Sequence, residues 1–263
     1  MLDAKTIKSA NKSQRKSMIL EAAARQTAPT TLGDLEKPYT IGKALNEFIE
    51  EYIEFEIHKD LDTGGNSVLI IDNLKQALNS RMSNYLLSAM TKMNVDTRTI
   101  EDMMADPKNA YELAGAKELA FANKVTRNLS TTMGSLWEKL ADISPYALNP
   151  DLEFGIKIRG IDIICKNIET QKIEFIQLKT TKNTLSGSQS ARANSELLLH
   201  QNPVFAAAFD VDRNWTYQNN PTIRRISGAE FWNQIGMDYP TVYNTVVTTI
   251  RQLEEQFVQT ISQ

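Results

Sequence analysis

The sequence predicts an α/β fold in which a sheet-containing core follows a helical N-terminal region. Apolar residues recur with the 3.6-residue period of helices over much of the first 144 positions. From about residue 150 they alternate with the two-residue period of strands, and β-branched residues become frequent. Strand-like and helix-like segments then alternate along the chain, which is the order typical of an α/β core.

The helical first half is expected to form a series of helices separated by short turns. A turn over residues 60–67 is built on Gly64 and Gly65, and Pro145 ends the last helix of the series. The expected helices cover residues 5–27, 40–58, 72–93, 108–129 and 134–144.

The second half is expected to begin with a β-hairpin. The segments 154–167 and 172–180 alternate as strands do, and the polar residues between them suit a tight connection. A Ser/Gly loop then leads into a helix, followed by an almost wholly apolar run over 203–211 that suits a strand buried on both faces. The remaining expected elements are a strand over 221–227, a short helix closed by Gly236 and a helix over 240–261.

The composition limits which metals the chain can bind and where in the cell we expect it. Cys165 is the single cysteine of the 263 residues, and together with two histidines it cannot supply a structural zinc site. Any bound metal would therefore take mainly oxygen ligands, as Mg²⁺ does. No window approaches eighteen apolar residues, and the first residues lack an apolar secretion segment, so we expect a cytoplasmic protein without membrane association.

Charge is unevenly distributed although the net charge is only −3. Residues 1–30 carry six Lys and Arg against two acids, whereas residues 31–62 carry nine acids against three Lys. The basic stretch is either a phosphate-binding surface or an ordinary solvated helix face.

The segment "KIEFIQLKTTKN" places two polar side chains on one face of a strand. Gln177 and Lys179 are two residues apart and therefore point the same way. Pairing about the 167–172 turn puts Asp162 almost opposite Gln177. The carboxylate and the amide oxygen can hold a divalent cation against a phosphate, while the lysine stabilises developing negative charge or positions the attacking water.

These residues resemble the PD-(D/E)xK nuclease superfamily, and most of all a type II restriction endonuclease in which Gln replaces the second acid. The motifs are "RGIDII", with Gly160, Ile161 and Asp162, and "IQLK", with Gln177, Leu178 and Lys179. Such enzymes often carry a helical glutamate before the first catalytic strand, and "GSLWEKLA" supplies Glu138 there. The stretch 222–236 is similar to the strand-then-helix ending of several restriction enzymes. The resemblance covers residues 134–236.

Two positions depart from the family pattern. Isoleucine precedes Asp162 where proline is common, and Gln177 offers a weaker cation ligand than a carboxylate. A further acid should then complete the site. Glu138 is the first candidate, with Glu153 or Glu174 as alternatives, although Glu174 falls on the opposite strand face from Gln177.

The resemblance implies a restriction-endonuclease-like core, a central mixed β-sheet flanked by helices, over residues 134–263. Residues 1–133 would then serve DNA contact or dimerisation. The implied activity is Mg²⁺-dependent hydrolysis of both strands of a short specific DNA duplex by a homodimer in a restriction–modification system. In this family the loop after the lysine runs along DNA, and its candidate contacts here are Thr180, Lys182, Asn183, Ser188, Gln189 and Arg192.

Two other functions remain open at the level of sequence. A nuclease of the same fold could act on branched or damaged DNA, and the hairpin could be merely structural in a non-enzymatic helical interaction protein. A Q-x-K tripeptide alone is a common polar stripe on a half-buried strand. The nuclease interpretation therefore depends on its combination with Asp162, Glu138 and the segment 222–236.

Overall fold

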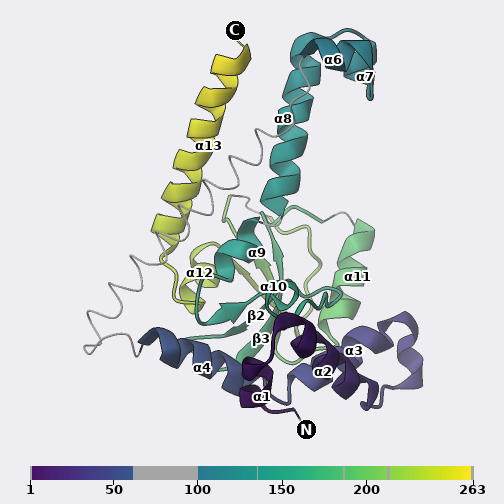
Figure 1. Ribbon diagram of the computed structural model, residues 1–263, viewed down its shortest axis with the longest axis vertical. Helices are drawn as coiled ribbons and strands as arrows, with labels where there is room; N and C mark the ends of the chain where they lie inside the picture. Colours follow the sequence, from purple (N-terminus) through teal and green to yellow (C-terminus); the bar gives the residue numbers. More distant parts are fainter. Residues whose placement is uncertain (1, 62–99, 135, 186, 212–213, 262–263) are drawn as a thin grey trace. The chain divides into compact units, whose positions relative to one another are not determined.

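The computed structural model describes residues 2–61, 100–134, 136–185, 187–211 and 214–261 (Figure 1). Contacts group residues 1–79 and 137–244 into one compact unit, and residues 80–136 and 245–263 into a second. The predicted helix over 72–93 and most of the predicted turn over 60–67 lie outside the described residues. None of the described helices is long and apolar enough to cross a membrane.

A five-stranded mixed sheet forms the centre of the first unit, which confirms the predicted α/β class. The strands follow one another across the sheet in chain order. The first three are antiparallel, and the last two run parallel to the third. They are β1 (Ala147–Leu148), β2 (Ile163–Lys166), β3 (Ile173–Lys179), β4 (Pro203–Ala207) and β5 (Arg224–Ser227).

The predicted hairpin is present between β2 and β3. Asn167 closes it, because its N–H donates to the Lys172 carbonyl at 2.9 Å and its side chain accepts from the N–H groups of Glu169 and Thr170. All five residues of β4 are buried, as expected for a strand covered on both faces.

The strand predicted over 154–167 is wrong in its first half. Phe154 ends a short helix, α10 (Pro150–Phe154), and Gly155 leaves it with a positive φ of 68°. The chain then makes a tight turn in which Ile161 N–H donates to the Ile158 carbonyl at 3.1 Å. Gly160 holds a φ of 78° at this turn, a conformation that favours glycine, and β2 begins only after it.

The helix predicted over 5–27 is two helices. Ala10 ends the first in an extended conformation, and Asn11 starts the second through a reciprocal capping box with Gln14. The helical elements of this region are α1 (Ala4–Ser9), α2 (Lys12–Ala24), the 3₁₀-helix η1 (Thr30–Leu35), α3 (Glu36–Leu45) and α4 (Ile49–Leu61).

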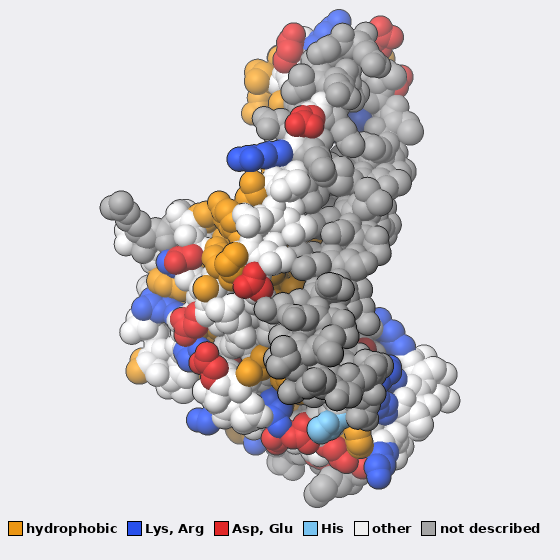
Figure 2. Space-filling model, turned by 90° about the vertical axis from the view of Figure 1, so that its left-hand side faces the viewer, with side chains coloured by type: hydrophobic (Ala, Val, Ile, Leu, Met, Phe, Trp, Pro, Cys, Tyr) orange, Lys and Arg blue, Asp and Glu red, His pale blue; other side chains and the backbone are white. Residues whose placement is uncertain are grey.

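These N-terminal helices pack against the sheet and share one core with it. Tyr52 and Phe154 meet edge to face at 5.3 Å, and Glu153 accepts hydrogen bonds from both Tyr52 and Arg15. The basic N-terminal stretch is thus partly engaged in ion pairs, since Lys8 also lies 2.6 Å from Glu56. In Figure 2, acidic side chains lie together at the bottom of the view, with basic side chains beside them.

Two helices pack against the parallel strands of the sheet. The helix α11 (Gly187–Leu197) packs against β3 and β4, and α12 (Ala229–Gln234) packs against β5. Trp232 is fully buried and donates its indole N–H to the Ala208 carbonyl at 2.8 Å, so it anchors α12 in the core. Gly236 follows α12 with a φ of 76°, as a helix-ending glycine does.

The second unit contains α6 (Ile100–Ala105), α7 (Ala110–Leu113) and α8 (Lys117–Gly134). The helix predicted over 108–129 is therefore interrupted. Gly115, with a φ of 67°, separates α7 from α8. The helix α13 (Tyr239–Ile261) agrees with the prediction and runs from the first unit into the second.

The burial of His200 predicts that the stability of the protein depends on pH. Its ring stacks on Phe175 at 4.9 Å and fits against Gly42, and neither of its nitrogens has a hydrogen-bond partner among the described residues. Burial lowers the pKa of His200 from 6.5 to about 4. The neutral ring is favoured in the folded state, so its stabilising contribution is complete above pH 6.5 and is lost as the pH falls toward 4.

The wild type should lose unfolding free energy as the pH falls from 6.5 to 4. We expect His200→Leu to lose less over the same range, by up to about 3 kcal/mol. Urea unfolding at a series of pH values measures this difference. His58→Gln, at an exposed position of α4, is the matched control. Parallel pH profiles for the wild type and His200→Leu would contradict the expectation.

Candidate metal and phosphate site

Asp162 directly precedes β2 and is held against β3. Ile163 pairs with Ile176, and Asp162 N–H donates to the Ile176 carbonyl at 2.9 Å. Asp162 also accepts from the Leu178 N–H, so it is bonded to the residues on either side of Gln177. Lys179 lies two residues beyond Gln177 on β3 and points to the same side of the strand as Gln177.

The Asp162 carboxylate is held by the end of the sheet. Because the chain turns away at Gly160, no further residue of β2 is in place to accept the Leu178 N–H. Oδ2 of Asp162 accepts that hydrogen bond instead, at 2.8 Å. The other oxygen, Oδ1, makes no hydrogen bond among the described residues, so one side of the carboxylate is fixed while the other faces the site.

Gln177 presents an unsatisfied acceptor. Its Oε1 atom is buried and has no hydrogen-bond partner within the described part of the chain. Leaving a buried polar atom unpaired costs about 1–3 kcal/mol. Such a cost is typical of a functional position, and a bound cation would satisfy this oxygen.

Glu138 approaches the same region from α9 (Leu136–Ala141). Its Oε2 atom accepts a hydrogen bond of 3.1 Å from Nδ2 of Asn149. The preceding residue, Trp137, is buried and donates its indole N–H to Thr180 Oγ1 at 3.0 Å. This bond fixes α9 to the residue that directly follows Lys179.

The charges of Asp162, Glu138 and Lys179 act on one another. Burial, followed by the negative charge of Asp162, raises the pKa of Glu138 to about 7. Burial also raises the pKa of Asp162, against the opposing effects of the Lys179 ammonium and the Leu178 N–H. A divalent cation favours the charged form of carboxylates at reduced hydration.

The residues present fit a hard cation such as Mg²⁺. Two carboxylates and one amide supply only oxygen, and Mg²⁺ commonly uses one or two carboxylates with water and substrate phosphate as its other ligands. The described residues contain no group of three or more His, Cys, Asp or Glu placed to hold a metal, so a cation here would also require a neutral oxygen, such as that of Gln177.

The two alternative acids lie elsewhere. Glu153 is bound to Arg15 and Tyr52 in the core between α2, α4 and α10. Glu174 is on the opposite strand face, where Arg224 contacts it at 2.8 Å and Asn167 donates to it at 3.2 Å. Both carboxylates are therefore occupied by structural partners.

Glu196 is a buried acid near the site that the sequence did not indicate. It lies on α11 and is only 4% exposed, and its charge contributes to raising the pKa of Asp162. Its Oε1 atom is 2.8 Å from Arg192 Nε and 3.8 Å from Arg159 Nε. A Cβ on Gly160 would come within 2.6 Å of its side chain, so the turn before Asp162 rests directly on Glu196.

The six residues predicted to contact DNA differ in the interactions that they make in the structure. Thr180 accepts from Trp137, and Lys182 is paired with Asp210 beneath Trp215. Arg192 is bound to Glu196, although its side chain is 69% exposed. Asn183 accepts from Thr181 at 2.8 Å, and Ser188 and Gln189 are exposed in the first turn of α11.

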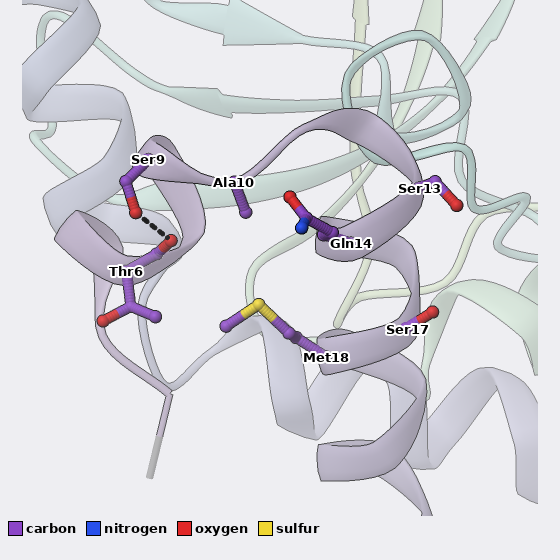
Figure 3. Close-up of a pocket in the computed structure, with 7 residues that line it drawn as sticks. All are labelled: Thr6, Ser9, Ala10, Ser13, Gln14, Ser17 and Met18. Carbon is purple, nitrogen blue, oxygen red and sulfur yellow. Dashed lines mark hydrogen bonds between the residues drawn. The ribbon is translucent and has the colours of Figure 1, made fainter.

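A hollow on the surface of the first unit involves other residues. It lies between α1 and α2 and is lined by small hydroxyl side chains together with Gln14 and Met18 (Figure 3). Ser9 donates its hydroxyl to the Thr6 carbonyl at 2.9 Å there. None of its lining residues belongs to the Asp162 site or carries a charge.

The function of the chain has to be inferred from the residues of the site. Neither a protein-family model nor a curated protein matches this chain.

Proposed function

We propose that this chain is a Mg²⁺-dependent endonuclease that hydrolyses both strands of a short specific DNA duplex, as a type II restriction endonuclease does in a restriction–modification system. One observation carries the proposal. The buried Gln177 oxygen has no hydrogen-bond partner among the described residues, Asp162 is bonded to the residues on either side of Gln177, and Lys179 shares the strand face of Gln177. An unpaired amide oxygen, a carboxylate and an ammonium on one face are the groups that cation-assisted phosphodiester hydrolysis requires.

The roles of the side chains follow from their surroundings. Asp162, Gln177 and Glu138 would hold Mg²⁺, which when bound lowers the pKa of a coordinated water and neutralises charge on the phosphate. Asp162 offers Oδ1, because Oδ2 is retained by Leu178 N–H. Lys179 stabilises negative charge on a non-bridging phosphate oxygen or orients the attacking water.

Binding of duplex DNA would use the end of the sheet at which β3 stops. The exposed residues of the first turns of α11, Ser188, Gln189 and Arg192, are the best-placed contacts. Lys182 is paired with Asp210. We therefore expect it to contribute less to phosphate binding than an unpaired lysine at this position would. Cutting both strands of a palindrome suits a homodimer in which each protomer addresses one strand.

Digestion of a long DNA of known sequence with the purified protein tests this function. We expect discrete fragments in Mg²⁺ and none in EDTA, and sequencing of the fragment ends gives the recognition sequence. Cleavage confined to branched or damaged duplexes would favour a repair nuclease instead. Failure to bind either divalent metal or DNA at low salt would contradict any nuclease and favour a helical interaction protein.

A further inference from the structure

Asn149 connects three parts of the structure around the proposed metal site. It directly follows β1, whose residues Ala147 and Leu148 pair with Cys165 and Ile164 of β2. It is 5% exposed, and its backbone N–H donates to Asp142 Oδ1 at 2.6 Å. The position of its side chain is therefore tied to the strand that begins next to Asp162.

Both ends of the Asn149 amide are used, and for different purposes. Oδ1 caps α10 by accepting from the N–H groups of Asp151 at 2.9 Å and Leu152 at 3.1 Å. Because the oxygen is committed to the helix, the NH₂ group must point the other way. There it donates to Glu138 Oε2 at 3.1 Å.

We infer that Asn149 is a positioning residue that sets the Glu138 carboxylate in register with Asp162 for a shared divalent cation. The inference rests on the proposed function. Glu138 comes from a separate short helix that is bonded to the end of β3 through Trp137, whereas Asn149 directly follows β1 and donates to the Glu138 carboxylate itself. Through its NH₂ group, Asn149 restrains the carboxylate of Glu138, which is a proposed metal ligand outside the sheet. Such supporting hydrogen bonds typically change metal affinity 10- to 100-fold.

The test is the variant Asn149→Ser. Serine caps helices about as well as asparagine, adds no charge, and is too short to donate to Glu138 as the amide does. Mn²⁺ binding, followed by electron paramagnetic resonance, is expected to weaken about tenfold. The unfolding temperature and the affinity for DNA in the absence of metal are expected to remain close to those of the wild type.

Asn109→Ser is a matched control. Asn109 caps α7 through its oxygen and donates from Nδ2 to Glu112 at 2.7 Å, so the substitution keeps a capping residue and removes the corresponding Asn-to-Glu hydrogen bond in the second unit. Its Mn²⁺ affinity should be that of the wild type. An equal loss of Mn²⁺ affinity in Asn109→Ser and Asn149→Ser would overturn the inference.

A double-variant cycle separates positioning from a general structural effect. In a Glu138→Gln background, Asn149→Ser should weaken Mn²⁺ binding no further, because its effect passes through Glu138. A further tenfold loss there would overturn the inference. Absence of Mn²⁺ binding by the wild type would overturn the proposed function together with it, whereas wild-type affinity in Asn149→Ser would overturn only the role of Asn149.

A second pair of variants tests the inference in case Asn149→Ser folds poorly. Asn149→Asp keeps a strong cap but places two carboxylates together, and combining it with Glu138→Gln restores the hydrogen bond with donor and acceptor exchanged. The double variant should unfold at a higher temperature than Asn149→Asp alone. Equal unfolding temperatures would overturn the inference.

Discussion

Asp162→Asn is expected to reduce DNA cleavage by about 10³-fold or more while the protein remains folded. The asparagine oxygen can still accept the Leu178 N–H that Oδ2 accepts now, so the end of the sheet keeps its hydrogen bond. What is lost is the negative charge facing the site. Single-turnover cleavage in Mg²⁺ measures the effect, with circular dichroism to establish that the fold is retained.

Asp162→Ala separates the two roles of the carboxylate. It removes the acceptor as well as the charge and leaves the buried Leu178 N–H unpaired, which should cost about 1–3 kcal/mol of stability in addition. Asp151→Asn, in the first turn of α10, is the control for loss of an acidic charge outside the site. Cleavage by Asp162→Asn at the wild-type rate would contradict the assignment.

Lys179→Met is expected to lower the cleavage rate by about 10²- to 10³-fold with little change in DNA binding. Methionine keeps much of the length and apolar stem of the side chain but removes the ammonium, whose charge acts on both Asp162 and Glu138. DNA binding is measured in Ca²⁺ and cleavage in Mg²⁺, so the two effects are recorded separately.

Lys172→Met is the matched control, since Lys172 is exposed in the hairpin one residue before β3 begins. It removes the same charge from the same hairpin and should cleave as the wild type does. Equal losses in Lys172→Met and Lys179→Met would indicate a general effect of charge on DNA binding and would contradict a specific role for Lys179.

The sequence predicted those features of the fold that depend on short-range patterns. The alternation in 172–180 and the turn before it gave the hairpin, and the apolar run at 203 gave a buried strand. The first strand was predicted too long because Ile156 and Ile158 before the turn, and Ile161 and Ile163 after it, each show the two-residue spacing of a strand. There the positive φ of Gly160 and its contact with Glu196 decide the conformation.

The candidate site was predictable only where one pairing register controls it. The two-residue period of β3 puts Gln177 and Lys179 on one side, and the hairpin turn brings Asp162 next to that strand, so these two features could be foreseen. Asn149 and Glu196 could not be placed in this way, because their approach to the site depends on how β1 and α11 pack. Neither asparagine after a short strand nor glutamate in a helix carries a distinguishing sequence signal.

The strand order has a consequence for the time course of folding. Each strand pairs with the one made just before it, so the sheet can grow in step with chain elongation and needs little long-range search. The first helices differ, because Tyr52 and Glu54 meet Glu153 and Lys166 only after more than a hundred further residues have been joined. Until then their apolar faces have no permanent cover, so this early segment is the part of a nascent chain most in need of protection from aggregation.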